Sequence, residues 1–337
     1  MSLAPALHKL RDKQNLTVAE TREIFDAIFS GTVPEEHIAA FLLALRGKGE
    51  TAEEILGAAT SMRAKAITIE APPNAIDIVG TGGDSKGTLN ISTATALVVA
   101  SCGVPVAKHG NRAATSQSGS SDVLAALGVN LEPSLAVLER CLREANLCFL
   151  FAPRHHPAMR HVAAIRKKLG VRTIFNLLGP LTNPANVKRH LIGVFSQDWL
   201  LPMAKVLQDL GSESAWLTHG QDGMDEITTT APSDIVAMQG DEIRQFTLFP
   251  QDTGITPPTP EQLLGGDASV NAEAIKKLLA GEKTPYRDIV TLNAAAALVV
   301  AEKTADIRQG VTLAAENLDS GATCATLHKV IEVTNRN

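Results

Sequence analysis

From about residue 75 onward, short apolar runs rich in β-branched residues alternate with segments of helical periodicity. The strand-like runs lie at residues 75–79, 104–110, 147–151, 190–196 and 214–220. Parallel strands must be joined by long crossover connections, which are usually helices. The alternation therefore predicts an α/β fold with a mostly parallel central sheet. Three further strand-like runs between Ile227 and Leu248 are separated only by short turns, which favours an antiparallel edge.

Both ends of the chain have helical patterns without strands. Near the N-terminus, Thr17 with Glu20 and Thr51 with Glu54 have the spacing of helix capping boxes. The last seventy residues include an alanine-rich segment at 288–303, which predicts a fully buried helix. The first seventy residues therefore contain the pattern of a small helical unit.

These patterns predict two bodies. A small all-helical domain at 1–70 precedes a larger α/β domain, formed by 71–159 and 189–337, with a mostly parallel central sheet. The segment at about 160–188 interrupts the alternation, and we expect it to return to the helical domain. That path would leave a cleft between the bodies, where ligand sites are common.

The composition limits the possible partners. The 337 residues are 45% hydrophobic and 20% charged, and the net charge is −5. A negative chain has no general attraction to nucleic acid or an anionic membrane, so any phosphate site must be local. No apolar run reaches the ~18 residues of a membrane span. The N-terminus lacks the pattern of a signal peptide, and the four cysteines lack C-x-x-C spacing. We expect a cytoplasmic protein with reduced thiols.

The sequence GTGGDSKG at 80–87 lies where a strand gives way to a helix. Glycines let backbone N–H groups approach a ligand closely, and phosphate is the usual ligand at such a place. Ser85 breaks the dinucleotide pattern G-x-G-x-x-G, and Lys86 precedes the last glycine, so the Walker A pattern fails too. The alternative is a glycine-rich turn without a ligand. Asn90, Ser92 and Thr93 lie at the expected helix start, where residues of these types commonly cap the helix. One cap needs only one of them, so the presence of all three after a glycine loop favours contact with an anion.

Two more polar segments follow strand-like runs. The segment 108–122 begins with Lys108, His109, Asn111 and Arg112 and continues with small hydroxyl residues. Two donor-rich loops at the carboxyl ends of neighbouring strands would face one crevice. A solvated basic turn is the alternative, and Arg112 could equally brace the fold.

Asp225 and Glu226 lie in a loop just before a strand-like run. Paired carboxylates are typical Mg²⁺ ligands beside a substrate phosphate, although a charged hairpin is the alternative.

His155, His156 and His161 lack the spacing of a zinc site, so we expect them to begin a helix or line the cleft. No Ser-His-Asp or activated cysteine pattern is present, which leaves covalent acyl chemistry unsupported.

The four longest motifs, at 77–93, 106–131, 149–184 and 219–227, resemble those of the anthranilate phosphoribosyltransferases in order and spacing. The likeness extends from the first helices to the last. It implies a homodimer, joined through the helical domain, with the fold class of the nucleoside phosphorylases. The implied reaction joins 5-phosphoribosyl 1-pyrophosphate (PRPP) and anthranilate, with release of pyrophosphate, in tryptophan biosynthesis.

The resemblance also implies site residues. The implied PRPP contacts are Gly80, Gly83, Asp84, Thr88, Asn90, Ile91, Ser92, Thr93, Lys108, His109, Gly110, Asn111, Arg112, Ala113, Ala114, Thr115, Ser116 and Ser120. The implied anthranilate contacts are Gly80, Asn111 and Arg166, with His109, His156, Met159, Gly179 and Pro180 along its passage. Lys108, Asn111 and Arg166 are the implied catalytic residues. Ser92, Asp225 and Glu226 would hold Mg²⁺, with two ions expected per subunit.

Two other functions remain open at this point. A pyrimidine nucleoside phosphorylase of the same fold class would use inorganic phosphate and a nucleoside without Mg²⁺. A non-catalytic relative that binds nucleic acid should have a basic face and should lack the glycine loop or the Asp-Glu pair. The negative net charge and both intact motifs disfavour that second alternative.

Overall fold

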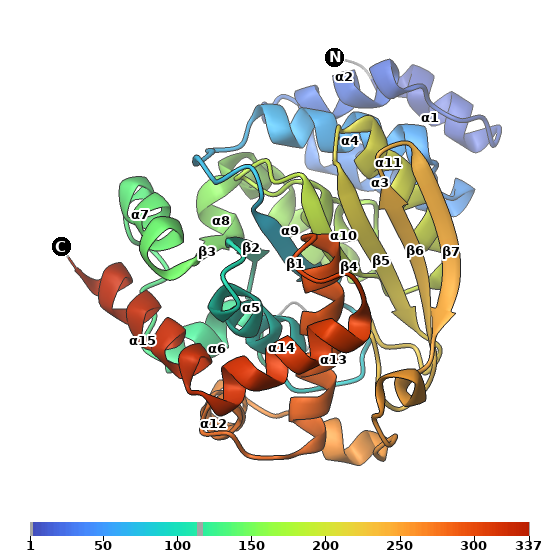
Figure 1. Cartoon of the computed structure of the whole chain (residues 1–337). Coiled ribbons are helices and arrows are strands. Elements are labelled where there is room, and N and C mark those ends of the chain that lie inside the picture. Colours follow the sequence, from blue (N-terminus) through green and yellow to red (C-terminus); the bar gives the residue numbers. More distant parts are fainter. Residues whose placement is uncertain (1–2, 113–116, 337) are drawn as a thin grey trace.

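The computed structural model describes residues 3–112 and 117–336. Its first four helices form a unit at one end of the molecule, drawn in blue in Figure 1. They are α1 (Ala4–Arg11), α2 (Val18–Phe29), α3 (Glu35–Lys48) and α4 (Ala52–Ala64). Thr17 and Thr51 cap α2 and α4 through the expected capping boxes, in which each side-chain oxygen accepts from the N3 backbone. The helix starts read from the sequence are confirmed.

A seven-stranded sheet forms the centre of the larger body, in the order β3-β2-β1-β4-β5-β6-β7. The pairs among the first five strands are parallel, and β6 and β7 pair antiparallel at one edge. The strands are β1 (Ile76–Gly80), β2 (Val106–Gly110), β3 (Leu147–Phe151), β4 (Arg189–Gly193), β5 (Ser214–Gly220), β6 (Ser233–Gln239) and β7 (Glu242–Leu248). The expected mostly parallel sheet with an antiparallel edge is confirmed.

Helices cover both faces of this sheet (Figure 1). The remaining α-helices are α5 (Ile91–Ser101), α6 (Ser120–Ala126), α7 (Leu135–Ala145), α8 (Ala152–His155), α9 (Arg160–Leu169), α10 (Phe175–Leu181), α11 (Leu200–Asp209), α12 (Ala268–Leu279), α13 (Pro285–Val300), α14 (Ile307–Asp319) and α15 (Ala322–Asn335). Short 3₁₀ turns are η1 (Pro157–Met159), η2 (Gln197–Trp199), η3 (Pro250–Thr253) and η4 (Pro260–Leu263).

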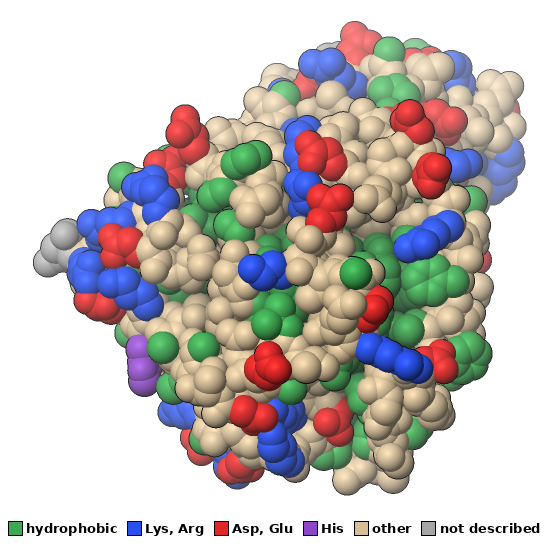
Figure 2. All heavy atoms as spheres, viewed as in Figure 1, with side chains coloured by type: hydrophobic (Ala, Val, Ile, Leu, Met, Phe, Trp, Pro, Cys, Tyr) green, Lys and Arg blue, Asp and Glu red, His purple; other side chains and the backbone are tan. Residues whose placement is uncertain are grey.

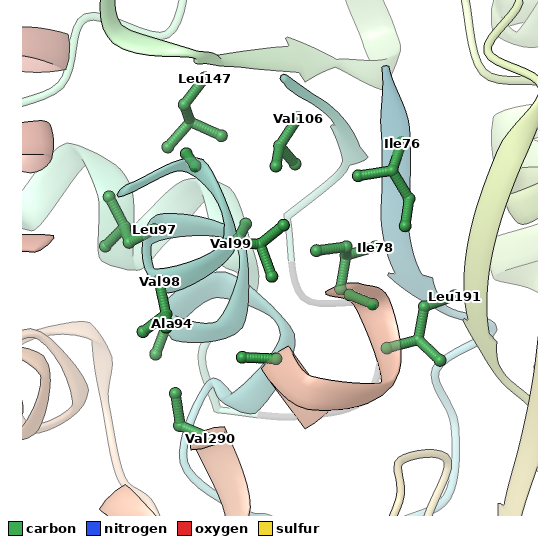
Figure 3. Packing of buried hydrophobic residues seen from close by; sticks show 14 of the residues in the cluster. Ile76, Ile78, Ala94, Leu97, Val98, Val99, Val106, Leu147, Leu191 and Val290 are labelled. Carbon is green, nitrogen blue, oxygen red and sulfur yellow. The ribbon is translucent and has the colours of Figure 1, made fainter. Parts of the chain in front are cut away.

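Each face of the sheet has its own hydrophobic core. Successive side chains of a strand point to opposite faces, so Leu191 of β4 joins one core and Ile192 the other. The first core holds α5 and the buried helix α13 against the sheet, and Figure 3 shows Val99 of α5 beside Ile78 of β1. The second core joins the N-terminal helices to α9, α10 and α11, and includes Phe175 of α10. The segment from α9 to α10 therefore packs with the helical unit.

One expected strand is wrong. Residues 227–230 are β-branched but form no strand, and the segment up to residue 248 holds only two strands, β6 and β7. Side chains occupy the backbone groups that a neighbouring strand would use. Asn293 of α13 both donates to Ile227 O and accepts from Ile227 N, and Ser233 Oγ accepts from Thr228 N.

The surface carries charges of both signs. On the face drawn in Figure 2, acidic and basic side chains of the described residues are interspersed. Within residues 3–112 and 117–336, no helix has the length and apolar character that crossing a membrane requires.

Candidate active site

The glycine-rich loop leaves the carboxyl end of β1 and is fastened at its base by three hydrogen bonds. Thr81 N donates to Gly193 O at 2.9 Å, and Phe195 N donates to the Thr81 hydroxyl at 3.0 Å. Gly82 N donates to Asp225 Oδ2 at 2.7 Å. The loop is therefore tied to the end of β4 and to the acidic loop.

The middle of the loop presents its own backbone. Gly82, Gly83 and Ser85 have φ values of 70°, 80° and 61°, in the left-handed region. Within the described part of the chain, the N–H groups of Gly83, Asp84 and Ser85 have no hydrogen-bond partner. Successive free N–H groups in such a turn form a concave anion site. The free N–H groups of the loop are therefore available to an anion.

The acidic pair lies against this loop, between β5 and β6. Glu226 Oε1 accepts a hydrogen bond from Ser92 N, 3.2 Å away, at the start of α5. The approach depends on two glycines. A Cβ on Gly80 would lie 2.6 Å from Asp225 Oδ2, and one on Gly193 would lie 1.6 Å from Asp225 O. The glycine loop, the α5 N-terminus and both acids thus meet at the carboxyl edge of the sheet.

Carboxyl groups crowd together at this edge of the sheet. Burial raises the pKa of Glu226 to about 7, and the nearby Lys108 ammonium partly offsets that rise. Burial, followed by the carboxylates of Asp84 and Glu226, raises the pKa of Asp225 well above its ordinary value. A cation between these groups would relieve both the repulsion and the burial of charge.

The residues fit Mg²⁺. Asp225, Glu226 and the Ser92 hydroxyl form a set of hard oxygen donors, which this ion prefers. Among the described residues, no three His, Cys, Asp or Glu side chains converge closely enough to hold a metal ion by themselves. Mg²⁺ commonly takes one or two carboxylates and completes its shell with water and substrate phosphate.

Lys108 supports the site from inside the protein. Its side chain is buried on β2, and its ammonium donates to Ile78 O at 2.6 Å and to the Ser92 hydroxyl at 3.2 Å. The positive charge therefore lies beneath the first turn of α5, where it bonds the Ser92 hydroxyl and attracts the Glu226 carboxylate.

The loop after β2 is described on both sides of a gap. Arg112 N donates to Asn111 Oδ1 at 2.8 Å, and the Arg112 guanidinium lies 5.8 Å from the ring centre of Phe151. Ser120, the first residue of α6, donates through its hydroxyl to Asn111 O at 3.3 Å. Ala113, Ala114, Thr115 and Ser116, which the resemblance assigns to PRPP, lie outside the described residues.

The N-cap of α5, Asn90, is held from several directions. Its Nδ2 donates to Ser118 O at 3.5 Å, and its Oδ1 accepts from Asn271 of α12 at 2.8 Å. Its carbonyl accepts from the hydroxyl of Tyr286, at the start of α13, at 3.0 Å. The other implied PRPP contacts on these elements are Thr88, Ile91, Thr93 and Gly110.

Three of the implied acceptor residues lie together beside β2. His109 Nδ1 lies 3.1 Å from Gly179 O, and the rings of His109 and His156 are 5.1 Å apart. Met159 lies in η1 and Pro180 in α10. Burial lowers the pKa of His109 to about 3 and that of His156 to about 4, so both rings are neutral near pH 7.

Arg166 lies on α9. Its half-buried guanidinium lies 5.3 Å from the ring centre of Phe175, and burial lowers its pKa. Within the described residues, no hydrogen bond or ion pair engages this guanidinium or joins it to Gly80 or Asn111. The structure thus brings the implied phosphate and metal residues together and leaves Arg166 with an unpaired cation.

Comparison with known proteins gives this arrangement a family. Two profiles match, "Glycosyl transferase family, helical bundle domain" over residues 4–66 and "Glycosyl transferase family, a/b domain" over residues 72–324. Anthranilate phosphoribosyltransferase of Beijerinckia indica is 53% identical over 98% of this chain and 97% of its own. That of Rhodospirillum rubrum is 56% identical over 94% and 92%. This chain belongs to the anthranilate phosphoribosyltransferase family.

Solved structures of the family agree with the fold. Anthranilate phosphoribosyltransferase from Thermus thermophilus has a TM-score of 0.92 at 41% identity, with 98% of this chain and 99% of that one covered. The Saccharomyces cerevisiae protein in complex with PRPP and Mg has a TM-score of 0.91 at 27% identity, covering 98% and 97%. The family and the fold class expected from the motifs are confirmed.

The histidine-rich segment at 155–161 is divided in this structure. His155 lies with Nδ1 2.6 Å from Ile67 O, whereas a Cβ on Gly31 would lie 2.6 Å from the ring of His161. His161 therefore packs beside the end of α2.

Sequence reasoning missed three residues of the site. Gly193 could have been found, because a glycine inside a strand-like run often marks close backbone approach. Asn271 and Tyr286, which hold Asn90, lie some 180 residues and more downstream and carry no local signal.

Proposed function

We propose that this protein transfers the phosphoribosyl group of PRPP to anthranilate, giving N-(5-phosphoribosyl)anthranilate and pyrophosphate, in tryptophan biosynthesis. The observation that carries the proposal is the meeting of free backbone N–H groups, the α5 N-terminus, the buried carboxyl group of Asp225 and the half-buried one of Glu226 at one edge of the sheet. Membership of the family supports it. So do family structures described as complexes with PRPP and Mg and with 4-fluoroanthranilate.

The glycine loop would hold the leaving pyrophosphate. As the bond from C1 of the ribose breaks, negative charge grows on the pyrophosphate oxygens, and the free N–H groups of residues 83–85 would donate to them. Losing one such donor commonly costs ~3 kcal/mol of transition-state stabilisation. Asn90, Ile91, Ser92 and Thr93, with Lys108 beneath them, would bind the remainder of PRPP at the helix N-terminus. Lys108 would act electrostatically through Ser92.

The metal assignment extends the same argument. Ser92, Asp225 and Glu226 would hold Mg²⁺, and we propose two ions per subunit. When bound, Mg²⁺ supplies positive charge to the departing pyrophosphate. The hydrogen bonds from Gly82 and Ser92 orient the carboxylates toward that place.

Anthranilate would bind between β2 and the segment from α9 to α10. Its amine is neutral near pH 7 and has a lone pair, so attack on C1 requires placement rather than a strong base. Asn111 would orient the amine, and Arg166 would pair with the carboxylate through its planar fork. The neutral rings of His109 and His156, with Met159, Gly179 and Pro180, would line the passage.

The assembly and location follow as further parts of the proposal. We propose a cytoplasmic homodimer joined through the helical domain at 1–70 and its returning segment at about 160–188. Exposed apolar side chains on that unit, Leu43 of α3 and Val171, support an interface there. The two bodies would close around PRPP and exclude water that could hydrolyse it.

One assay tests the activity directly. The purified protein is mixed with anthranilate, PRPP and Mg²⁺, and the anthranilate fluorescence and released pyrophosphate are followed together. We expect fluorescence to fall in step with pyrophosphate release, and to stay constant without PRPP or after chelation of the metal. Phosphorolysis of a pyrimidine nucleoside without Mg²⁺, with unchanged anthranilate fluorescence, would overturn the proposal in favour of a nucleoside phosphorylase.

A further inference from the structure

Arg172 connects the segment from α9 to α10, which carries the proposed acceptor residues, with the glycine-rich loop, which is proposed to bind the donor. It lies in the turn between α9 and α10, the segment that carries Arg166 and Gly179. That segment packs with the helical unit through buried residues such as Phe175. The side chain of Arg172 is exposed and leaves this segment toward the glycine-rich loop.

The guanidinium of Arg172 is fixed by a ring and a carbonyl. It lies 4.3 Å from the ring centre of Phe195, and its Nη2 donates a hydrogen bond to Gly83 O. Its Nε lies 3.4 Å from the position that a Cβ on Gly83 would take. Phe195 also donates through its backbone N–H to the Thr81 hydroxyl, so it holds the base of the loop and contacts the side chain that holds the middle.

The hydrogen bond from Arg172 to Gly83 O determines where the next backbone N–H group, that of Asp84, points. In a trans peptide, the C=O of one residue and the N–H of the next point in opposite directions. With Gly83 O turned to the Arg172 cation, the Asp84 N–H faces away from Arg172 and has no partner within the described residues. The same hydrogen bond directs the Gly83 carbonyl oxygen toward Arg172, so the partial negative charge of that oxygen is turned away from an anion bound on the other side.

We propose that Arg172 is a positioning residue that pre-orders the glycine-rich loop, so that its N–H groups face the pyrophosphate of the donor substrate. This rests on the proposed function for the identity of the anion. Arg172 does not touch the substrate. It acts through the Gly83–Asp84 peptide, and it does so from the segment that carries the acceptor residues.

The inference predicts a selective loss of donor binding. Arg172→Ala should raise both the Kd for inorganic pyrophosphate and the KM for PRPP by about tenfold, which corresponds to one charged hydrogen bond and a more mobile loop. The KM for anthranilate at saturating PRPP and the melting temperature should stay close to wild type. Phe195→Leu keeps the backbone N–H but removes the ring, so it should give an intermediate rise.

A matched control separates position from charge. Arg244 of β7 lies 5.7 Å from the ring centre of Phe246, an arrangement similar to that of Arg172 and Phe195, and Arg244→Ala should leave both constants unchanged. Arg172→Lys keeps the charge without the planar fork and should recover only part of the affinity. Full recovery by Arg172→Lys, or an Arg172→Ala variant within twofold of wild type, would overturn the inference.

The pyrophosphate arm keeps the two proposals apart. Isothermal titration calorimetry with inorganic pyrophosphate and Mg²⁺ reports on the loop whether or not anthranilate is the acceptor. A wild-type protein that binds pyrophosphate but transfers nothing to anthranilate would overturn the proposed function alone. Equal pyrophosphate affinity in wild type and Arg172→Ala would overturn the role of Arg172 alone.

Discussion

Single glycines let the acidic loop approach the sheet. Gly193 ends β4 directly under the backbone of Asp225, and a Cβ there would lie 1.6 Å from the Asp225 carbonyl oxygen. That atom belongs to the backbone, so no side-chain rotation can relieve the clash. Because Asp225 also accepts from Gly82, moving it would displace the glycine loop as well.

Gly193→Ala should therefore lower activity by at least tenfold and destabilise the fold by about 2 kcal/mol, as overpacking commonly does. The measurements are initial rate at saturating substrates and the urea unfolding midpoint. Gly47→Ala is the matched control, since a Cβ at Gly47 of α3 meets nothing within 4 Å. An active and fully stable Gly193→Ala protein would contradict the close approach.

Arg166 is a cation that the protein leaves unpaired among its described residues, held over the ring of Phe175. If it pairs with the carboxylate of anthranilate, Arg166→Ala should raise the KM for anthranilate by about tenfold or more and that for PRPP by less than twofold. Arg166→Lys should be intermediate. Steady-state kinetics with each substrate varied in turn measures the split, and an equal rise in both constants would remove the assigned role.

At Ile227, a side chain from a helix makes the backbone hydrogen bonds that a neighbouring strand would otherwise make. Asn293 of the buried helix α13 makes both backbone hydrogen bonds of Ile227, the residue after Glu226. Asn293→Leu would leave buried backbone groups unpaired at about 1–3 kcal/mol each, and would free the acidic loop. We expect a lower unfolding midpoint and a higher Mg²⁺ concentration for half-maximal rate.

The control for that variant is Asn317→Leu. The Asn317 amide donates within its own helix, to Leu313 O, and no hydrogen bond joins it to the acidic loop among the described residues. It should leave the metal titration unchanged. A metal titration of Asn293→Leu that also matches wild type would show that Asn293 supports stability only.

How far the sequence predicts the elements depends on where their hydrogen bonds end. The capping boxes at Thr17 and Thr51 are satisfied within four residues, so local pattern was enough to place α2 and α4. Residues 227–230 have strand-like side chains, but both backbone groups of Ile227 are paired with Asn293, 66 positions away. A partner at that separation cannot be read from local periodicity, and the strand prediction failed there.

The same distinction holds for the whole molecule. The alternation of patterns predicted the sheet and its antiparallel edge, and the glycine loop and acidic pair were each predicted as a ligand segment. Their convergence depends on Gly193 and on the parallel pairing of β1 with β4, which place Gly80 beside Gly193. The role inferred for Arg172 depends on a contact 89 positions away, which no local pattern contains.

The two-core architecture also predicts how the whole molecule responds to acid. His109, His156 and His190 are buried, and burial lowers their pKa values to about 3, 4 and 3. In the unfolded chain, histidine has a pKa of ~6.5, so below that pH the unfolded state takes up protons that the folded state refuses. Stability contributed by each neutral ring is present above pH ~6.5 and is lost as the pH falls toward its folded pKa. Raised carboxylate pKa values at Asp225 and Glu226 act in the opposite direction.

His190→Gln isolates one contribution from this sum. His190 lies on β4 with Nε2 3.1 Å from the Ser212 hydroxyl, and glutamine can keep a hydrogen bond there without binding a proton. Between pH 7 and pH 5, wild type should lose roughly 2 kcal/mol more unfolding free energy than the variant, since each pKa unit corresponds to ~1.4 kcal/mol. Urea unfolding at half-unit pH steps measures the difference. Parallel curves of unfolding free energy against pH for the two proteins would mean that His190 binds its proton in the folded state as readily as in the unfolded state, so that burial does not lower its pKa.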